Sequence, residues 1–241
     1  MSAQPDHQAS VIAFYSSWDG QRTYVNPRTV IKTLRQRRIP PDARILDIGF
    51  GNGEIALAVA RAYPQARIEG IDLTAYNVTM AGRKADEAGL KNVAFRVEDA
   101  ESWQSPAAAY HAIYAMQVMQ FIARPEALMR RIFTGLHPGG AILFATPFLP
   151  PDPALHPFFL DAYARVIPNS FQYRTEDAWY AGLFDAGFER IHTAKAHWEP
   201  AAQPPDWREH YRRAVEEHGL DFETARRHTW GGLISARKPG S

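Results

Sequence analysis

Residues 45–56 read ILDIGFGNGEIA, and this stretch decides the fold. Its first residues are mostly apolar and predict a buried strand, with Asp47 inside the end of that strand. The glycines that follow, Gly49, Gly51 and Gly53, predict a tight turn that opens into a helix. Glycine is needed where a ligand must approach the backbone without a Cβ in the way. A glycine turn alone is a weak signal, so the neighbouring segments must show what it binds.

A second acid stands at the end of the next predicted strand. Residues 68–74 read IEGIDLT, in which Asp72 closes the strand. A carboxylate at this position suits a bidentate hydrogen bond to the hydroxyls of a ribose. The two segments together therefore favour a ligand that contains a nucleoside.

Taken together, these segments resemble motif I of the class I S-adenosylmethionine-dependent methyltransferases, in which an acid and one further residue precede GxGxG. Asp47 and the three glycines match that pattern position by position, and Asp72 matches the ribose-binding acid of the family. The resemblance is close over roughly residues 40–146. It implies S-adenosylmethionine (SAM) as cofactor and S-adenosylhomocysteine as product.

Two further segments match the same family. In VEDAESW, residues 97–103, the resemblance implies that Asp99 binds the adenine amino group and that Ala100 and Trp103 flank the ring. The LHPGG segment at 136–140 matches the family's turn into the fifth strand.

Two readings compete with the cofactor assignment. The first is a glycine turn without a ligand, which the order and spacing of the matching segments disfavour. The second is a nicotinamide enzyme, which prefers GxGxxG and needs neither Asp47 nor Asp99. On the SAM reading, the cofactor-binding residues are Tyr15, Tyr24, Asp47, Gly49, Phe50, Gly51, Gly53, Asp72, Leu73, Asp99, Ala100 and Gln117.

Strands and helices alternate along most of the chain, which predicts an α/β fold with a mostly parallel sheet and helices on both faces. We expect strands at 43–48, 67–72, 93–97, 111–116, 141–146, 188–198 and 230–237. We expect helices at 7–18, 27–38, 54–63, 76–88, 125–136, 158–166, 175–186 and 206–218. The resemblance makes this a Rossmann-like seven-stranded sheet whose last strand is antiparallel.

One domain over residues 1–241 is expected. It comprises an N-terminal helical cover (1–40), a cofactor-binding core (41–146) and two substrate-side insertions (147–174 and 199–229). Neither insertion has enough apolar residues for a core of its own.

Composition narrows the function classes. The 241 residues include 46% hydrophobic and 22% charged residues, which is typical of a globular chain. The net charge of +1 does not suggest nucleic-acid binding, and the absence of cysteine removes thiolate catalysis and Cys-based zinc sites. No run approaches the ~20 apolar residues of a membrane helix, and the N-terminus lacks a signal-peptide pattern. A cytoplasmic protein is expected, with a homodimer through the 199–229 segment as an open alternative.

The carboxyl ends of the strands should hold the acceptor. Methyl transfer needs mainly positioning, and a base only where the acceptor must lose a proton early. His197 and His156 are the candidate bases because histidine titrates near neutrality, although surface histidines seldom catalyse. Gln120, Phe148, Trp198 and Trp230 are the candidate substrate-binding residues, with sheet packing as the alternative for the two tryptophans. No metal site is expected.

Three other segments leave their roles open. The position that opens the fourth strand, commonly acidic in the family, is His111. The resemblance implies that Gln117 in MQVMQ stands near the methionine moiety of the cofactor. Tyr15 and Tyr24 could cover the sulfonium cation of the cofactor. Five arginines near the C-terminus either grip an anionic substrate or form a solvated face; these are Arg208, Arg212, Arg213, Arg226 and Arg227.

These observations predict methyl transfer from SAM to O, N or C of a small organic metabolite, in biosynthetic tailoring. The alternative is a cofactor-binding protein of the same fold that acts as a cyclase or transfers no methyl group.

Overall fold

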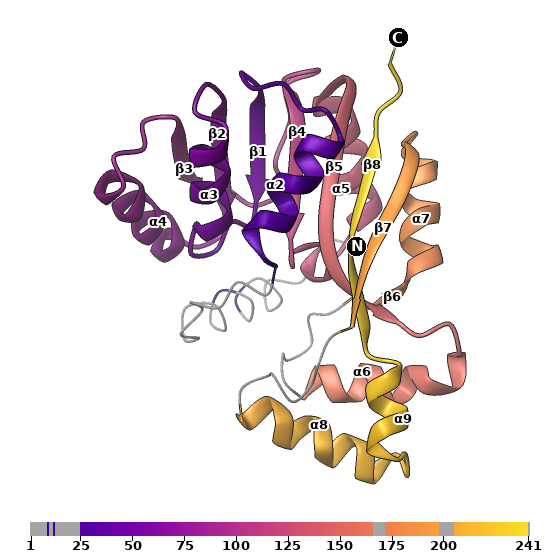
Figure 1. Cartoon of the computed structure of the whole chain (residues 1–241). Coiled ribbons are helices and arrows are strands. Elements are labelled where there is room, and N and C mark those ends of the chain that lie inside the picture. The colour runs from indigo at the N-terminus through magenta and orange to yellow at the C-terminus, as the bar shows by residue number, and fades with distance from the viewer. Residues whose placement is uncertain (1–8, 10–11, 13–24, 166–171, 198–204, 241) are drawn as a thin grey trace.

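The computed structural model describes residues 9, 12, 25–165, 172–197 and 205–240 (Figure 1). Within them, eight strands form one sheet in the order β3-β2-β1-β4-β5-β8-β7, and the short β6 pairs with the end of β5. The strands are β1 (Arg44–Ile48), β2 (Arg67–Asp72), β3 (Val93–Val97), β4 (Tyr110–Met116), β5 (Leu136–Leu149), β6 (Arg174–Thr175), β7 (Glu189–His197) and β8 (Trp230–Arg237). Among these strands β8 runs in the direction opposite to the others, so the expected Rossmann-like architecture is confirmed.

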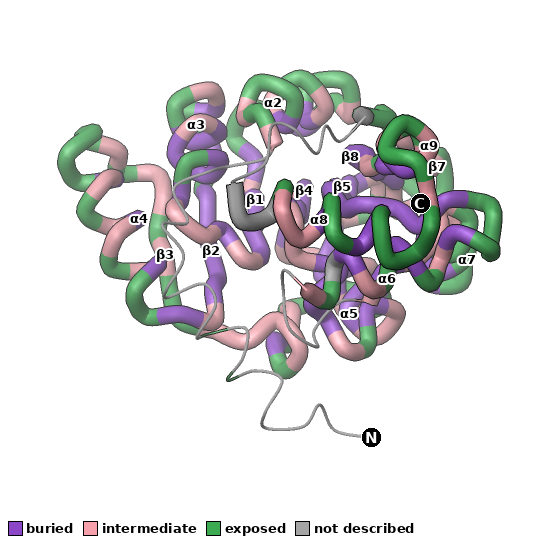
Figure 2. Tube along the Cα trace, turned by 90° about the horizontal axis from the view of Figure 1, so that it is seen from below, coloured by how far each residue is buried: buried purple, intermediate pink, exposed green. Residues whose placement is uncertain are grey.

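Helices cover both faces of the sheet. On one face lie α2 (Pro27–Gln36), α3 (Glu54–Ala62) and α4 (Ala75–Glu87), and on the other α5 (Pro125–Gly135) and α7 (Glu176–Asp185) (Figure 1). Separate apolar clusters fill the two interfaces, because the inner strands are buried on both faces. Figure 2 looks at the carboxyl ends of the strands and shows the buried sheet between the exposed helix surfaces.

Helix starts follow the capping residues. Asn26 precedes Pro27 and accepts a hydrogen bond from the Arg28 amide, and the Thr175 hydroxyl accepts from the Ala178 amide. Of the predicted helix at 7–18, all but residues 9 and 12 lie outside the described residues.

The largest difference from the predicted elements is in β5. The sequence predicts 141–146, whereas β5 runs from Leu136 to Leu149. The extension exists because tertiary partners are available, since Leu136 pairs with Tyr110 and Phe148 pairs with Trp230. A local apolar pattern does not contain those partners.

The two insertions pack on each other beyond the carboxyl ends of the strands (Figure 1). The first holds η2 (Pro153–Leu155) and α6 (His156–Ala164), and the second holds α8 (Pro205–Glu217) and α9 (Phe222–Arg227). Together they bury one apolar cluster that includes Phe158, Phe159 and Tyr211. The two insertions thus share one apolar cluster; we call α6 with the adjoining Arg165, α8 and α9 the cap.

Ion pairs also join the two halves of the cap. Arg165, directly after α6, binds Asp161 of that helix and Glu217 of α8, and His218 lies 3.1 Å from Asp161. The apolar side of α8 also packs within the chain, because Ala214 and Val215 are buried in the shared cluster.

Candidate functional site

The candidate site lies where the direction of the crossovers reverses. The adjacent strands β1 and β4 continue into α3 on one face of the sheet and α5 on the other. Ligands of open α/β sheets bind in the crevice outside the carboxyl ends of such strands. The glycine turn after β1 and the segment after β4 meet there.

The three glycines of the turn have different reasons to be glycine. All three adopt positive φ, +66° at Gly49, +56° at Gly51 and +78° at Gly53. A Cβ on Gly49 would lie 2.4 Å from Val118 Cγ2, and one on Gly53 would lie 2.7 Å from Ala81 Cβ. A Cβ on Gly51 would meet no atom of the described residues within 4 Å. Protein packing thus explains two glycines, while Gly51 faces open space that a ligand can enter.

Asp72 builds the turn that the sequence assigns to the ribose. Its Oδ1 accepts hydrogen bonds from Thr74 N (2.9 Å), Thr74 Oγ1 (2.8 Å) and Asn77 Nδ2 (3.1 Å), and its Oδ2 accepts one from Gly51 N (2.9 Å). Because a carboxylate oxygen accepts about two hydrogen bonds, only Oδ2 keeps a free position. Asp72 therefore links the glycine turn to α4 and offers one further acceptor, and its contact to a ribose stays a prediction.

Asp47 is a buried carboxyl. It is 2% exposed and lies opposite Tyr114 in the register of β1 and β4. Among the described residues, no hydrogen bond of normal geometry reaches Asp47 Oδ2 or the Tyr114 hydroxyl, although the hydroxyl lies close enough to Asp47 to lower the pKa of that carboxyl. Burial raises the pKa of Asp47 well above its ordinary value; the Tyr114 hydroxyl opposes this shift and the charge of Asp72 adds to it. Tyr114 was not singled out in the sequence, since only the strand pairing brings it to Asp47.

The segment after β3 holds the predicted adenine contacts. Asp99 accepts a hydrogen bond from the Glu101 amide (2.8 Å), and Arg131 of α5 donates one to the Ala100 carbonyl (3.0 Å). Trp103 was expected to flank the adenine, but it is 2% exposed and lies in the core beside Tyr110. That expectation was wrong, because the indole ring packs into the apolar core between this segment and the sheet.

Two other predicted cofactor contacts are only partly available. The Phe50 side chain is buried against Phe95, with ring centroids 4.5 Å apart, so only its backbone remains a candidate. Leu73 is half-buried directly after Asp72. Tyr15 and Tyr24 lie outside the described residues.

A pair of glutamines follows β4. Gln117 has a φ of +60°, a conformation that costs a residue with a side chain on the order of 1–3 kcal/mol and that clusters at functional sites. Its Oε1 accepts a hydrogen bond from Gln120 Nε2 at 3.0 Å. Gln120 is 3% exposed, and its Oε1 has no partner among the described residues. The backbone carbonyl of Gln120 accepts from the Gln172 amide at 2.7 Å, which ties this turn to the first insertion.

The remaining predicted rim residues fall into two groups. Phe148, Trp230 and His197 are neighbours in the register of β5, β8 and β7, so the backbones meet at one level of the sheet as expected. Phe148 is buried in the core, whereas Trp230 is 40% exposed and its indole donates to the Arg227 carbonyl. The structure describes the backbone of His197 but not its side chain, and Trp198 lies outside the described residues.

His156, the other candidate base, stands at the start of α6. Its Nε2 lies 2.8 Å from the Pro150 carbonyl oxygen. A carbonyl can only accept, so Nε2 carries the proton and Nδ1 is the basic nitrogen.

His111 and the C-terminal arginines have structural contacts. At the amino end of β4, away from the site, His111 Nδ1 accepts the Arg44 amide at 3.1 Å. Glu209 binds both Arg212 and Arg213, and Glu223 binds Arg226. These pairs favour the solvated face over an anion-binding patch.

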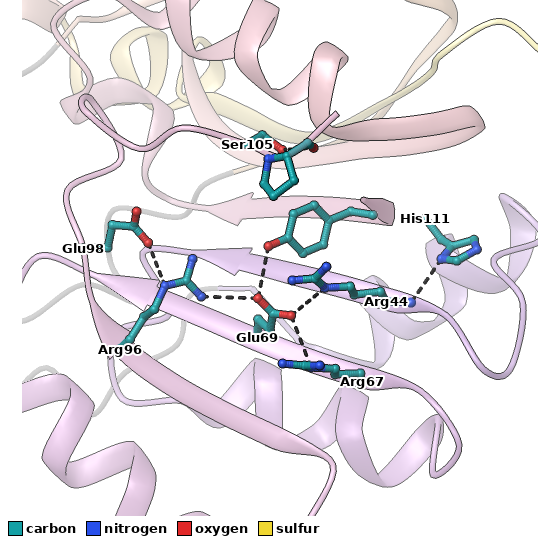
Figure 3. A network of polar contacts seen from close by, with 9 residues as sticks. Arg44, Arg67, Glu69, Arg96, Glu98, Ser105 and His111 are labelled. Carbon is teal, nitrogen blue, oxygen red and sulfur yellow. Dashed lines mark hydrogen bonds and ion pairs between the residues drawn. The ribbon is translucent and has the colours of Figure 1, made fainter. Parts of the chain in front are cut away.

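A polar cluster in the middle of β2 was not predicted (Figure 3). Glu69 accepts hydrogen bonds from Arg44 Nε (2.6 Å) and the Tyr110 hydroxyl (3.1 Å), and Arg67 and Arg96 lie 3.4 and 3.3 Å from it. Burial alone would raise the pKa of Glu69, but the Arg44 and Tyr110 contacts outweigh it and lower the pKa. The cluster joins β1, β2, β3 and β4 below the strand ends, so we assign it to sheet stability.

No cluster of potential metal ligands occurs among the described residues, and none of the described helices is long and apolar enough to cross a membrane.

Comparisons with known proteins agree with this geometry. A family profile described as a methyltransferase domain matches residues 18–193. The chain is 27% identical over 135 residues to trans-aconitate 2-methyltransferase of Variovorax paradoxus, covering 56% of this chain and 49% of that protein. It thus spans about half the length of the curated trans-aconitate methyltransferases that it matches.

Solved structures show the same fold. The YcgJ protein of Bacillus subtilis superposes with a TM-score of 0.72 at 20% identity, covering 89% of this chain and 98% of that one. The [4+2]-cyclase SpnF superposes with a TM-score of 0.67 at 22% identity, covering 93% and 86%. With the glycine turn, the acid after β2 and a family match over most of its length, the chain belongs to the class I SAM-dependent methyltransferases.

Proposed function

We propose that this protein transfers the methyl group of SAM to O, N or C of a small organic metabolite in biosynthetic tailoring. The observation that carries the proposal is the space over Gly51 that no described residue fills, in a glycine turn that lies against the strained segment after β4 through Gly49 and Val118. The name of the Variovorax relative, trans-aconitate 2-methyltransferase, supports a small-molecule acceptor.

The residues at the crevice fit the cofactor. Gly51 leaves room for a ligand at the turn, Asp72 Oδ2 keeps one acceptor position, and Asp47 Oδ2 is a buried oxygen without a partner among the described residues. Asp99 and Ala100 would hold the adenine end. The bound sulfonium would supply the methyl group, while these residues orient it and exclude water.

The glutamine pair indicates the polarity of the acceptor. One hydrogen bond between two amides leaves an N–H donor on one residue and a carbonyl acceptor on the other, whichever way the two amides are turned. A neutral hydroxyl or amide satisfies both. Arg165, Arg212 and Arg213 of the cap are already paired with carboxylates, so these cations do not select an anionic acceptor.

The cap would form the acceptor pocket or its lid. It lies beyond the strand ends, and Gln172 links the first insertion directly to Gln120. His156 Nδ1 and His197 remain our candidate bases, and Phe148, Trp198 and Trp230 our candidate pocket residues. The dimer alternative loses its main support because the apolar side of α8 packs inside the chain.

A screen with isotope-labelled methyl SAM tests this function. We expect the wild-type protein to give a labelled product and S-adenosylhomocysteine with at least one neutral, hydroxyl-bearing metabolite, and Gln120→Leu to lose product while keeping SAM affinity. The [4+2]-cyclase among the structural neighbours supports one alternative, a cyclase. Conversion of a metabolite to an isomer of unchanged mass, without label, would establish that alternative instead.

A further inference from the structure

Two buried titratable groups face each other beneath the glycine turn. Asp47 and Tyr114 are register partners on β1 and β4, the two strands that border the crevice. Tyr114 is fully buried, and Asp47 is only 2% exposed. Each has a buried oxygen without a partner among the described residues. Such atoms are uncommon in folded proteins, and each calls for a ligand or a change of protonation.

The surroundings of Asp47 supply no positive charge within the described part of the chain. Two titratable groups act on Asp47. Asp72, at the end of β2, is a second acid, and Tyr114, on β4, is neutral. The two charged residues of α3, Glu54 and Arg61, are exposed, while its buried side chains, among them Ile55 and Ala56, are apolar. An isolated carboxylate in such a place is strongly disfavoured, and the carboxyl normally stays protonated instead.

Binding of the cofactor changes this balance. SAM carries a sulfonium and an ammonium against one carboxylate, so its net charge is positive. A cation close to a buried carboxyl favours the ionised form. The Tyr114 hydroxyl also favours the ionised form, because a hydrogen bond donated to a charged carboxylate is stronger than one donated to a neutral carboxyl.

We propose that Asp47 is protonated in the cofactor-free protein and gives up this proton to solvent as SAM binds, with Tyr114 as the positioning residue that donates to the resulting carboxylate. The inference rests on the proposed placement of Asp47 in the cofactor site. The O–H bond of the carboxyl breaks, its electron pair stays on Asp47, and the proton passes to water or buffer.

Calorimetry measures this proton directly. SAM is titrated into the full-length protein in phosphate and in Tris, two buffers with different ionisation enthalpies, between pH 6 and pH 9. Below the pKa of Asp47 we expect release of roughly one proton per SAM and a gain in affinity of about tenfold per pH unit. Above that pKa both effects should vanish.

Asp47→Asn is the matched control, because it keeps the shape of the side chain and removes its titration. Any proton that the amino group of SAM itself contributes remains in this variant, so the difference between the two proteins belongs to Asp47. Tyr114→Phe should move the onset of proton release to higher pH, since it removes a hydrogen bond to the carboxylate. A merely structural tyrosine would leave that onset unchanged.

Difference infrared spectroscopy on the wild-type protein covers the case in which Asp47→Asn fails to fold. Adding SAM should remove the carbonyl band of one protonated carboxyl. The inference fails if wild type and Asp47→Asn exchange equal numbers of protons, or if this band persists in the complex. Absence of SAM binding at every pH would instead overturn the proposed function itself.

Discussion

The open space over Gly51 makes a substitution there a sharp test of the cofactor site. Gly51→Ala places a methyl group where no atom of the described residues lies within 4 Å, so the free energy of unfolding should change only by the cost of the backbone conformation. Alanine at a φ of +56° costs about 1–2 kcal/mol, and the stiffer unfolded chain returns about 0.4–1 kcal/mol. We expect the free energy of unfolding to fall by about 1 kcal/mol, while the affinity for SAM falls at least tenfold, about 1.4 kcal/mol.

Gly89 provides the matched control. It follows the C-cap of α4 with a φ of +67°, and a Cβ there also meets no described residue within 4 Å, but this end of α4 lies away from the crevice. Gly89→Ala should lose the same stability and keep wild-type affinity. Gly49→Ala, by contrast, adds a contact of 2.4 Å to Val118 and should lose a further ~1–3 kcal/mol of stability.

Urea unfolding and calorimetric titration with SAM measure both quantities. Equal SAM affinities for Gly51→Ala and Gly89→Ala would refute the assignment of the open space to the cofactor. A loss of folding in Gly51→Ala alone would show that this glycine serves the turn.

Two other predictions concern the sheet. Glu69→Gln should lower the free energy of unfolding by about 1–3 kcal/mol in denaturant titrations at pH 7, because Arg44 and Arg96 lose a buried anion. Folding lowers the pKa of Glu69, so this stabilisation is present above the ordinary pKa of a glutamate and is lost as pH falls through the pKa of the folded protein. The difference in unfolding free energy between wild type and variant should therefore disappear in acid. Burial and the nearby His137 lower the pKa of His111, whose neutral ring accepts a hydrogen bond from the Arg44 amide. The stabilisation from His111 is therefore present above about pH 6.5, the ordinary pKa of histidine, and declines as pH falls below it. His111→Asn keeps an acceptor that does not titrate, and thermal melts from pH 7.5 to 5 should show a smaller loss than in wild type; equal losses would contradict the role of His111.

The core of the fold was predictable because its signals are local. These signals are the apolar runs, the glycine turn and the acids at the ends of two strands. Between residues 44 and 116, the observed helices and strands begin and end within about two residues of the predicted ones, which is the usual uncertainty of element ends. The β5 extension and β6 were not predicted, because both depend on strand partners distant in the sequence.

The candidate site was predictable only in part, for a similar reason. Gly51 and Asp72 follow from spacing along the chain, but the role of Tyr114 requires knowing which strands are neighbours. Trp103 was misassigned because a sequence pattern does not distinguish a ring that covers a ligand from one that fills the core. The cap shows the same limit: neither insertion predicts a core, and their shared cluster appears only when both are folded.

A crystal structure of the protein with S-adenosylhomocysteine would test the central claim most directly. We predict density for the homocysteine part over Gly51, with a ribose hydroxyl within hydrogen-bond distance of Asp72 Oδ2 and the Tyr114 hydroxyl directed at Asp47. Density at another place on the molecule, with the space over Gly51 filled by protein side chains or solvent, would contradict the account.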